Sequence, residues 1–583
     1  MSLQQSNLSA SGYDVVIATT QDSINAMIQD YMRDAGNKFG KITNCLYANN
    51  YSMPFDSMYN PVTTTDEATF KAMCGTDPLT DVKTSWNRNM PYTPAITNLQ
   101  NSHFIYAFTA QPGVPKYYTT GDNPPVLPQL FEIAPDNQSA IITMLFKSFS
   151  YVQGGFDENT QKLVILNPRT MGANEAWSMR FKVPFANNTA VDIPGPVQTQ
   201  VNNMGSSPFS IQQLLLDFSK AQCIGFTDGI QMGDASDAIA RGISLQKIDP
   251  VLGYSIVVQP PSNGVNIPPA LQDVLEFSNL RDVQVTSLEL EANAYVDGSG
   301  NYVTTPNSDQ AALASLNYVC AVNSHALKPI APLKWNWLDS IAEENNYHGA
   351  IAVSRNIISK YLSTQLVPLM DANCYLPYVK ANTVDLIDVD FPDPVLTPGQ
   401  APTLTYHPTG SILLDYRYKV NSSDTAGALG CNGTISLDSI FDAQVSYSGN
   451  SLTIVQHLQM VLNVSVHGTY SGPVNVVDKT ITDVYTISVD DQGNLQFSVP
   501  SSTPVDNSST GSVGNYTNWS WMVNQDTSTF AKAAQTMMSS ALKDIQLAAL
   551  KQFVFPAGEV FSVKDAIFSD YGDLVGHITY AGA

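Results

Sequence analysis

Histidine is the side chain best suited to metal binding and to proton transfer near neutral pH, and this chain has few of them. The seven are His103, His325, His348, His407, His457, His467 and His577. None belongs to an H-E-x-x-H or H-x-H motif, the spacings that bring two imidazoles to one metal ion. His457 and His467 share one face of a predicted strand, but at about 3.3 Å per residue they lie roughly 33 Å apart. We predict no catalytic histidine and no metal site.

Two other segments match chemistry-bearing motifs only in part. The acidic run 385–393 could be pictured as a calcium site, but it lacks the EF-hand pattern, and Asp388 and Asp390 alternate with apolar residues as in a half-exposed strand. The segment 36–42 resembles a phosphate-binding loop, yet no Ser or Thr follows Lys41, and a predicted helix precedes it. The sequence contains no G-x-S-x-G elbow and no nucleotide fingerprint. We predict a protein that is not an enzyme and has no cofactor.

Three segments have the period of an amphipathic helix. The first spans about 21–36, where apolar residues recur at i, i+3, i+4 and i+7 after a capping pattern that begins at Thr19. The second spans about 349–366 and is expected to end before Pro368. The third and longest spans about 528–551. Its apolar stripe requires a partner surface to cover it.

Most of the remaining chain has the alternation of β-strands. Residues 452–466 alternate over about fifteen positions, against a usual strand length of about 3–10 residues. Hairpin patterns occur at 288–302 and 487–499, each with Gly and Asp or Asn in the turn. Long strands joined by short turns predict antiparallel sheets with strong curvature. The fold class is therefore α+β, with long amphipathic helices packed in highly curved antiparallel sheets.

The order of these elements predicts two halves. A helix followed by a long β region begins at residue 21 and again at residue 349, with a boundary between about 320 and 345. We expect an N-terminal half at 1–330 and a C-terminal half at 331–583. Segments rich in proline or small polar residues predict loops at 110–128, 184–208, 259–269, 391–410 and 500–518.

Composition narrows the class of protein and its location. The chain has 583 residues, 28 Lys+Arg and 51 Asp+Glu, hence a net charge of −23, which argues against a nucleic-acid partner. The N-terminal residues lack the basic and apolar regions of a Sec signal, and no run of about 18 apolar residues occurs. The six cysteines are scattered, as expected for reduced thiols. We expect synthesis in the cytoplasm, with release, if any, by a route independent of a signal peptide.

Where an amphipathic helix and a curved sheet do not close completely, an elongated apolar slot is left between them. Flexible methionine side chains on the helices would adapt to an apolar ligand. For each residue taken singly, ordinary core packing is the competing interpretation. The predicted ligand contacts are Met27, Tyr31, Met32, Met537, Met538, Ala541 and Ile545.

Both ends of the chain resemble a known family. The residues are Gly12-Tyr13-Asp14-Val15-Val16, Phe555-Pro556-Ala557-Gly558, Phe561-Ser562-Val563-Lys564, Phe568-Ser569-Asp570, Asp573-Leu574-Val575 and His577-Ile578-Thr579-Tyr580. They resemble the OrfX-type accessory proteins encoded beside clostridial neurotoxins, which are similar in fold to the tubular lipid-binding (TULIP) superfamily that includes bactericidal/permeability-increasing protein. The resemblance covers roughly sixty residues and implies a TULIP-like fold, a lipid ligand and toxin-cluster partners.

Several functions compete on these observations. The leading hypothesis is a soluble TULIP-like protein that binds lipid or another elongated apolar molecule. The alternative is a non-enzymatic protein-interaction or toxin-accessory module, insecticidal by implication of the family, with a solidly packed interior and functional loops. A membrane-active toxin is a third hypothesis, but few lysines on the 528–551 helix support it, so we expect membrane contact to be peripheral at most.

Overall fold

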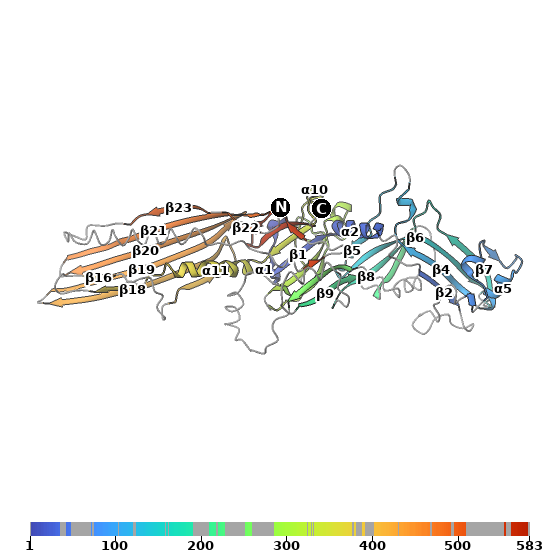
Figure 1. Ribbon diagram of the computed structural model, residues 1–583, viewed down its shortest axis with the longest axis horizontal. Helices are drawn as coiled ribbons and strands as arrows, with labels where there is room; N and C mark the ends of the chain where they lie inside the picture. Colours follow the sequence, from blue (N-terminus) through green and yellow to red (C-terminus); the bar gives the residue numbers. More distant parts are fainter. Residues whose placement is uncertain are drawn as a thin grey trace, which may run out of the picture.

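We describe the protein from a computed structural model. Strand pairing is antiparallel throughout the described residues, and helices are few, which defines an α+β fold. The molecule is elongated, with two large sheets at opposite ends and a central sheet between them (Figure 1). The structure describes residues 2–34, 42–47, 71–72, 75–102, 104–120, 124–157, 159–160, 162–189, 209–216, 220–227, 251–258, 285–322, 325–327, 329, 332–344, 346–375, 378–380, 388–390, 401–428, 431–466, 469–490, 495–498, 500–508, 553–554 and 561–580.

The central sheet combines strands from both ends of the sequence. Its order is β12 (Val285–Asn293), β13 (Ser315–Val322), β1 (Val15–Thr20), β14 (Gly349–Val353), β27 (Leu574–Tyr580) and β25 (Phe561–Val563), with β26 (Ile567–Phe568) beside β27. Both of its faces are covered. Val15 and Ile17 face the main core, while Val16 and Ala18 face a second cluster that contains Trp337.

The second predicted helix is partly wrong. Residues Gly349–Val353 form strand β14, and helix α11 begins only at Arg355 and runs to Asp371. The buried run from Gly349 to Val353 is apolar on both faces, and a short run of this kind fits a helix as well as a strand. Pro368 lies inside the last turns of α11 instead of ending it. The central sheet contains strands from before and after residue 330. The division of the chain into two halves at about residue 330 therefore stays a prediction.

One end of the molecule is an 11-stranded sheet. Its main order is β2 (Ile42–Tyr47), β4 (Phe104–Pro112), β6 (Ser139–Phe156), β8 (Ser178–Thr189), β9 (Phe209–Leu216), β11 (Val251–Val258) and β24 (Phe553–Val554). The side strands are β3 (Trp86–Asn87), β5 (Phe131–Ile133), β7 (Leu163–Thr170) and β10 (Gln222–Thr227).

The other end is a seven-stranded sheet of unusually long strands. It contains β17 (Thr403–Tyr406), β18 (Ile412–Ala428), β19 (Cys431–Ser448), β20 (Ser451–Val466), β21 (Thr469–Val489), β22 (Leu495–Phe497) and β23 (Ser501–Asp506). The predicted long strand at 452–466 is confirmed by the 16 residues of β20. The predicted hairpin at 487–499 is confirmed by the pairing of Ile487 with Phe497. At 288–302, β12 pairs with β13, and only a bridge between Val296 and Tyr302 closes the predicted turn.

Four of the predicted loops contain strand residues. These are 110–112 in β4, 184–189 in β8, 403–406 in β17 and 501–506 in β23. Strand β23 is exposed along its whole length, so it lacks the apolar alternation that identifies a strand and is held by its pairing with β21. The fifth loop, 259–269, lies outside the described residues. The acidic segment Asp388–Asp390 forms strand β16, paired with β15 (Tyr378–Lys380), as its alternation predicts.

The described helices are short except for α2 and α11. Helix α2 spans Gln21–Asp34, which confirms the first predicted helix. Its cap differs by one residue, because the hydroxyl of Thr20 and not of Thr19 accepts the N–H of Ser23. The third predicted helix, 528–551, lies outside the described residues. The shorter helices are η1 (Ser2–Gln5), α1 (Leu8–Ser11), α4 (Pro78–Asp81), α5 (Pro94–Asn101), η3 (Lys116–Tyr118), α9 (Ser308–Ala312) and α10 (Ile341–Glu344).

A buried arginine joins the seven-stranded sheet to the central sheet. Arg355 at the start of α11 has 0% exposure, and its guanidinium donates to the carbonyl oxygens of His407 at 2.6 Å, Gly410 at 2.7 Å and Tyr571 at 3.2 Å. The acceptors belong to segments more than 150 residues apart in the sequence. The arginine therefore fixes the β17–β18 turn against the segment that precedes β27.

Candidate ligand-binding sites

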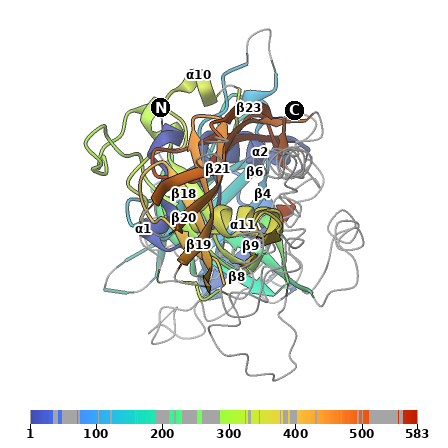
Figure 2. The same cartoon turned by 90° about the vertical axis from the view of Figure 1, so that its left-hand side faces the viewer.

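Helix α11 lies against one face of the seven-stranded sheet. Figure 2 looks along the molecule from this end and places α11 beside β18, β19 and β20. Its buried side chains include Ile358, Tyr361 and Leu366, which belong to the same apolar core as Tyr416 and Phe441 of the sheet. Burial extends over more than half of the circumference of the helix, so α11 is a core helix more than an amphipathic surface one.

Polar contacts fix the middle and the C-terminus of α11 on the sheet. Near the middle, the hydroxyls of Ser363 and Tyr406 lie 2.9 Å apart. Near the C-terminus, the hydroxyl of Tyr416 donates to the carboxylate of Asp371. Burial, followed by the hydrogen bond to Asp371, raises the pKa of Tyr416 far above its usual value, so this phenol keeps its proton. These two bonds anchor the helix on the sheet.

The face of the sheet that α11 covers is apolar well beyond the helix. We call this surface the inner face, and its buried residues are Tyr416, Tyr418, Val420, Leu437, Ser439, Phe441, Leu458, Met460, Leu462 and Val477. Cross-strand register places Tyr418 opposite Phe441, Val420 opposite Ser439 and Ser439 opposite Met460. The inner face is thus continuous across three strands.

Two hydroxyls without hydrogen-bond partners among the described residues interrupt this apolar surface. They belong to Tyr418, which is 2% exposed, and to Ser439, which is 0% exposed. Their register makes them diagonal neighbours on adjacent strands, a spacing of about 7–8 Å. A buried hydroxyl without a partner costs about 1–3 kcal/mol. Sequence reasoning missed both residues, because alternation marks a face as buried without showing which polar atoms lack partners.

The predicted ligand contacts on α2 belong to two different clusters. Met27 is partly buried against the main core, whereas Met32 is buried in a small separate cluster with Leu127, Leu130 and Leu145. Tyr31 lies in α2, but its side chain is not described. Met537, Met538, Ala541 and Ile545 lie outside the described residues. A shared role of these seven residues in ligand binding stays a prediction.

Polar residues of α2 hold the helix against β5, a role that the spacing of apolar residues does not reveal. The side-chain oxygen of Asn25 accepts the N–H groups of Leu130 at 2.7 Å and Phe131 at 2.8 Å, and its amide nitrogen donates to the carbonyl oxygen of Phe131 at 2.7 Å. The side-chain oxygen of Gln21 accepts the N–H of Ile133 at 2.7 Å. These amides take the place of a neighbouring strand along one edge of β5, and so dock α2 against it.

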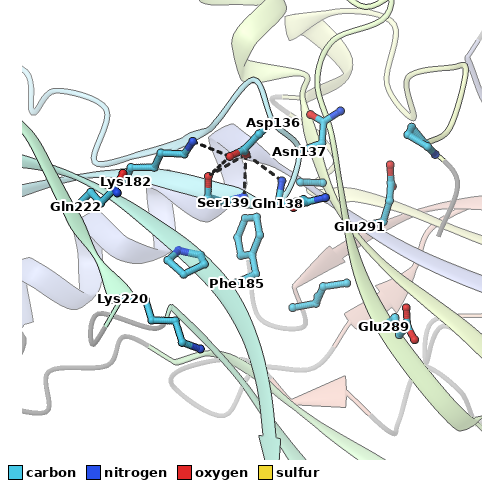
Figure 3. A pocket seen from close by; sticks show the side chains of 14 residues that line it. Asp136, Asn137, Gln138, Ser139, Lys182, Phe185, Lys220, Gln222, Glu289 and Glu291 are labelled. Carbon is cyan, nitrogen blue, oxygen red and sulfur yellow. Dashed lines mark hydrogen bonds and ion pairs between the residues drawn. The ribbon is translucent and has the colours of Figure 1, made fainter. Parts of the chain in front are cut away.

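A pocket of about 800 Å³ lies between the central sheet and the 11-stranded sheet. Side chains from the β5–β6 turn, β8, the start of β10 and β12 line it (Figure 3). On one wall, the carboxylate of Asp136 accepts from Lys182 at 2.7 Å and from the hydroxyl of Ser139 at 2.8 Å. Burial alone would raise the pKa of Asp136, but the hydrogen bonds from Lys182 and its neighbours outweigh it and lower that pKa. The charges of Lys182 and Asp136 therefore compensate each other.

The opposite wall carries a buried carboxyl. Glu291 of β12 is 3% exposed, and its Oε2 accepts from the side-chain amide of Asn317. Its Oε1 has no hydrogen-bond partner among the described residues. Burial raises the pKa of Glu291 to about 7, with the hydrogen bonds from Asn317 and the N–H of Leu333 opposing the shift. Burial raises the pKa values of Asp483 and Asp573 as well, so Glu291 is one of several described acids in a poorly solvated environment.

Most described histidines pair with aspartate instead of forming a metal site. The pairs are His325 with Asp14 at 2.9 Å, His407 with Asp415 at 2.8 Å, His457 with Asp478 at 2.8 Å and His577 with Asp565 at 2.7 Å. Within the described ranges, no three His, Cys, Asp or Glu side chains gather to hold a metal ion. These pairs link residues on neighbouring strands and turns, and the sequence spacing gave no signal of them.

The fold defines the class of the protein: it is an α+β protein of antiparallel sheets with few helices. No protein-family model matches the chain, and no curated protein matches it. Among solved structures, the chain is similar to the crystal structure of lipopolysaccharide binding protein, with 9% sequence identity over 97% of this chain and 99% of that chain and a TM-score of 0.25. A likeness at this score supports no argument about the chain. The resemblance to OrfX-type proteins and the toxin-cluster partners it implies stay predictions.

Among the described residues, none of the helices has the length and apolar character that crossing a bilayer requires.

Proposed function

We propose that the protein binds lipid or another elongated apolar ligand along the inner face of the seven-stranded sheet beside α11, in a TULIP-like arrangement, and that it acts without catalysis. The observation that carries the proposal is the pair of unpartnered hydroxyls, Tyr418 and Ser439, within this apolar surface. A packed protein core rarely keeps such groups. A ligand with an apolar chain and one polar end group would pack against Val420 and Met460 and supply the missing hydrogen bonds.

The first test uses the full chain as purified. Organic extracts analysed by mass spectrometry are expected to contain an acyl-chain lipid, and the delipidated protein is expected to take up a fluorescent fatty acid. Ser439→Phe places a bulky ring on the inner face opposite Val420 and should weaken uptake by about tenfold or more. Ser436→Phe is the matched control, because Ser436 lies on the same strand with its side chain on the opposite face.

Tyr418→Phe separates ligand binding from core packing. Removing a buried hydroxyl that lacks a partner should leave the ligand-free protein as stable or more stable by up to about 1 kcal/mol, while weakening a ligand whose polar end uses that hydroxyl. A clean extract, no uptake, and equal behaviour of the Ser439→Phe and Ser436→Phe variants would overturn the proposal. That result would favour the alternative, an interaction module with a solidly packed interior.

A further inference from the structure

The pocket between the central sheet and the 11-stranded sheet is separate from the inner face of the seven-stranded sheet. It lies where β12, the edge strand of the central sheet, approaches β8 and β10. Its volume of about 800 Å³ is in the range of small-molecule sites. Four polar residues that line it are exposed, namely Gln138, Lys220, Gln222 and Glu289. A molecule in the pocket can therefore reach their side chains.

Contacts within the 11-stranded sheet hold one wall of the pocket together. Gln222 of β10 lies directly opposite Lys182 of β8 in the cross-strand register, and Lys182 pairs with Asp136 at 2.7 Å. The same carboxylate accepts the N–H of Gln138 at 3.0 Å. The carbonyl oxygen of Gln138 in turn accepts the N–H of Phe185 at 3.3 Å. The two glutamines and Phe185 thus belong to one continuous wall.

The ionic groups of the pocket balance in charge. Lys182 and Asp136 compensate each other. Lys220 and Glu289 carry opposite charges on opposite walls (Figure 3). Glu291 also lines the pocket, but its carboxyl is buried, and with a pKa of about 7 it is partly protonated at neutral pH. A ligand with a net charge would be attracted by one wall and repelled by the other, so the balance favours a neutral ligand.

The exposed groups of the pocket offer both donors and acceptors. The side-chain amides of Gln138 and Gln222 each donate and accept, the ammonium of Lys220 donates, and the carboxylate of Glu289 accepts. A purely apolar ligand would remove these groups from water without giving them hydrogen bonds, at a cost for each group. The ligand must therefore carry several groups that both donate and accept.

Partly exposed apolar side chains lie beside these polar groups. The ring of Phe185 lies 6.4 Å from that of the buried Phe131, and Phe185 keeps part of its surface exposed. Leu290 of β12 is partly exposed on the other wall. The pocket thus combines apolar contact area with polar recognition, as small-molecule sites commonly do.

We propose that this pocket binds a neutral polyhydroxylated molecule, a small saccharide, whose hydroxyl groups bond to Gln138, Gln222 and Glu289. Each hydroxyl carries one donor and two acceptor lone pairs, which matches the mixture of groups in the pocket. The C–H face of the sugar ring would pack against Phe185. The saccharide could be a free sugar or the headgroup of a glycolipid, and the shared chemistry is the array of hydroxyl groups.

Saturation-transfer difference NMR of the full chain tests the proposal, with methyl α-glucoside, methyl α-galactoside, methyl α-mannoside and maltose as free probes. Flotation with phosphatidylcholine vesicles, with and without monogalactosyl diacylglycerol, forms the glycolipid arm. Transfer to a free sugar would identify a free-saccharide site, and binding only of vesicles that contain the glycolipid would identify a headgroup site. No binding in either arm, or binding of glucuronate or glucosamine without binding of a neutral sugar, would overturn the proposal. Uptake of fatty acid on the inner face would be unaffected.

Substitutions of exposed residues decide which groups are responsible, and they leave the core intact. Gln222→Ala and Glu289→Ala should each weaken sugar binding by about fivefold or more. Gln496→Ala is the matched control, because Gln496 is an exposed glutamine of β22 in the seven-stranded sheet. An equal loss in Gln222→Ala and Gln496→Ala would overturn the assignment.

Glu289→Gln tests whether the ligand is neutral. It keeps an acceptor oxygen and removes the charge, so binding of a neutral sugar should stay within about threefold. A loss in Glu289→Gln as large as in Glu289→Ala would show that the charge is what the ligand recognises and would overturn the proposal. Thermal unfolding verifies that each variant is folded.

Discussion

At the scale of single residues, Glu291 gives the protein a defined dependence of stability on pH. Its pKa is about 7 in the folded protein, against 4.5 for a solvated glutamate. Between these values the folded chain holds a proton that the unfolded chain has lost, so the contribution of Glu291 to stability is full below about pH 4.5 and is lost as the pH rises to about 7. A shift of this size corresponds to about 3 kcal/mol.

Urea unfolding of the unmodified protein and of Glu291→Gln between pH 4.5 and 8 measures this contribution. Other acids also titrate in this range, so the informative quantity is the difference between the two proteins. We expect the unmodified protein to lose stability relative to the variant as the pH rises. If the free energies of unfolding of the two proteins changed with pH in parallel, the raised pKa of this buried carboxyl would be contradicted.

At the scale of elements, α2 shows how polar side chains position a helix. Asn25 satisfies backbone groups of Leu130 and Phe131 that have no strand partner on that side. Asn25→Ala leaves these buried groups unpaired and should lower the free energy of unfolding by about 3 kcal/mol. Asn421→Ala is the control, since Asn421 makes one exposed bond to Asp438 and should change stability by less than about 0.5 kcal/mol. Equal effects of the two substitutions in urea unfolding would contradict the docking role.

Some helices and strands could be predicted from the sequence and others could not. Helix 21–34 and the strand at 451–466 were predictable because one face of each is buried, which imposes a clear period on the residues. Strand β14 was not predictable, because both faces of the central sheet are covered and β14 is therefore apolar on both of its sides. The candidate sites depend on which polar atoms lack partners. Ser439, for example, acquires that property from the strands that pair with it on either side, and no local pattern of residues records it.

At the scale of the whole molecule, the placement of the seven-stranded sheet against the central sheet depends on a few buried polar contacts. The carboxylate of Asp573 accepts the N–H of Leu8 at 2.7 Å and the N–H of Arg355 at 3.0 Å, while the guanidinium of Arg355 bonds to the β17–β18 turn. The N-terminal segment, α11 and the segment before β27 therefore meet at one point. The main apolar core also continues from the central sheet into the seven-stranded sheet, so a ligand on the inner face would contact a core shared by both.

Arg355→Lys tests this junction. Lysine keeps the charge but replaces the planar fork of donors with a single ammonium, so several buried carbonyl groups, including those of His407 and Gly410, lose their partner. We expect a loss of about 3 kcal/mol or more in the free energy of unfolding. Hydrogen exchange should rise first at residues 407–412 and 569–573, where the sheets meet. Arg417→Lys is the control, because the side chain of Arg417 is 66% exposed and lies 3.5 Å from Asp442, a surface pair that contributes little. Uniform exchange along the chain, or equal stability of the two variants, would show that apolar packing alone holds the end sheet in place.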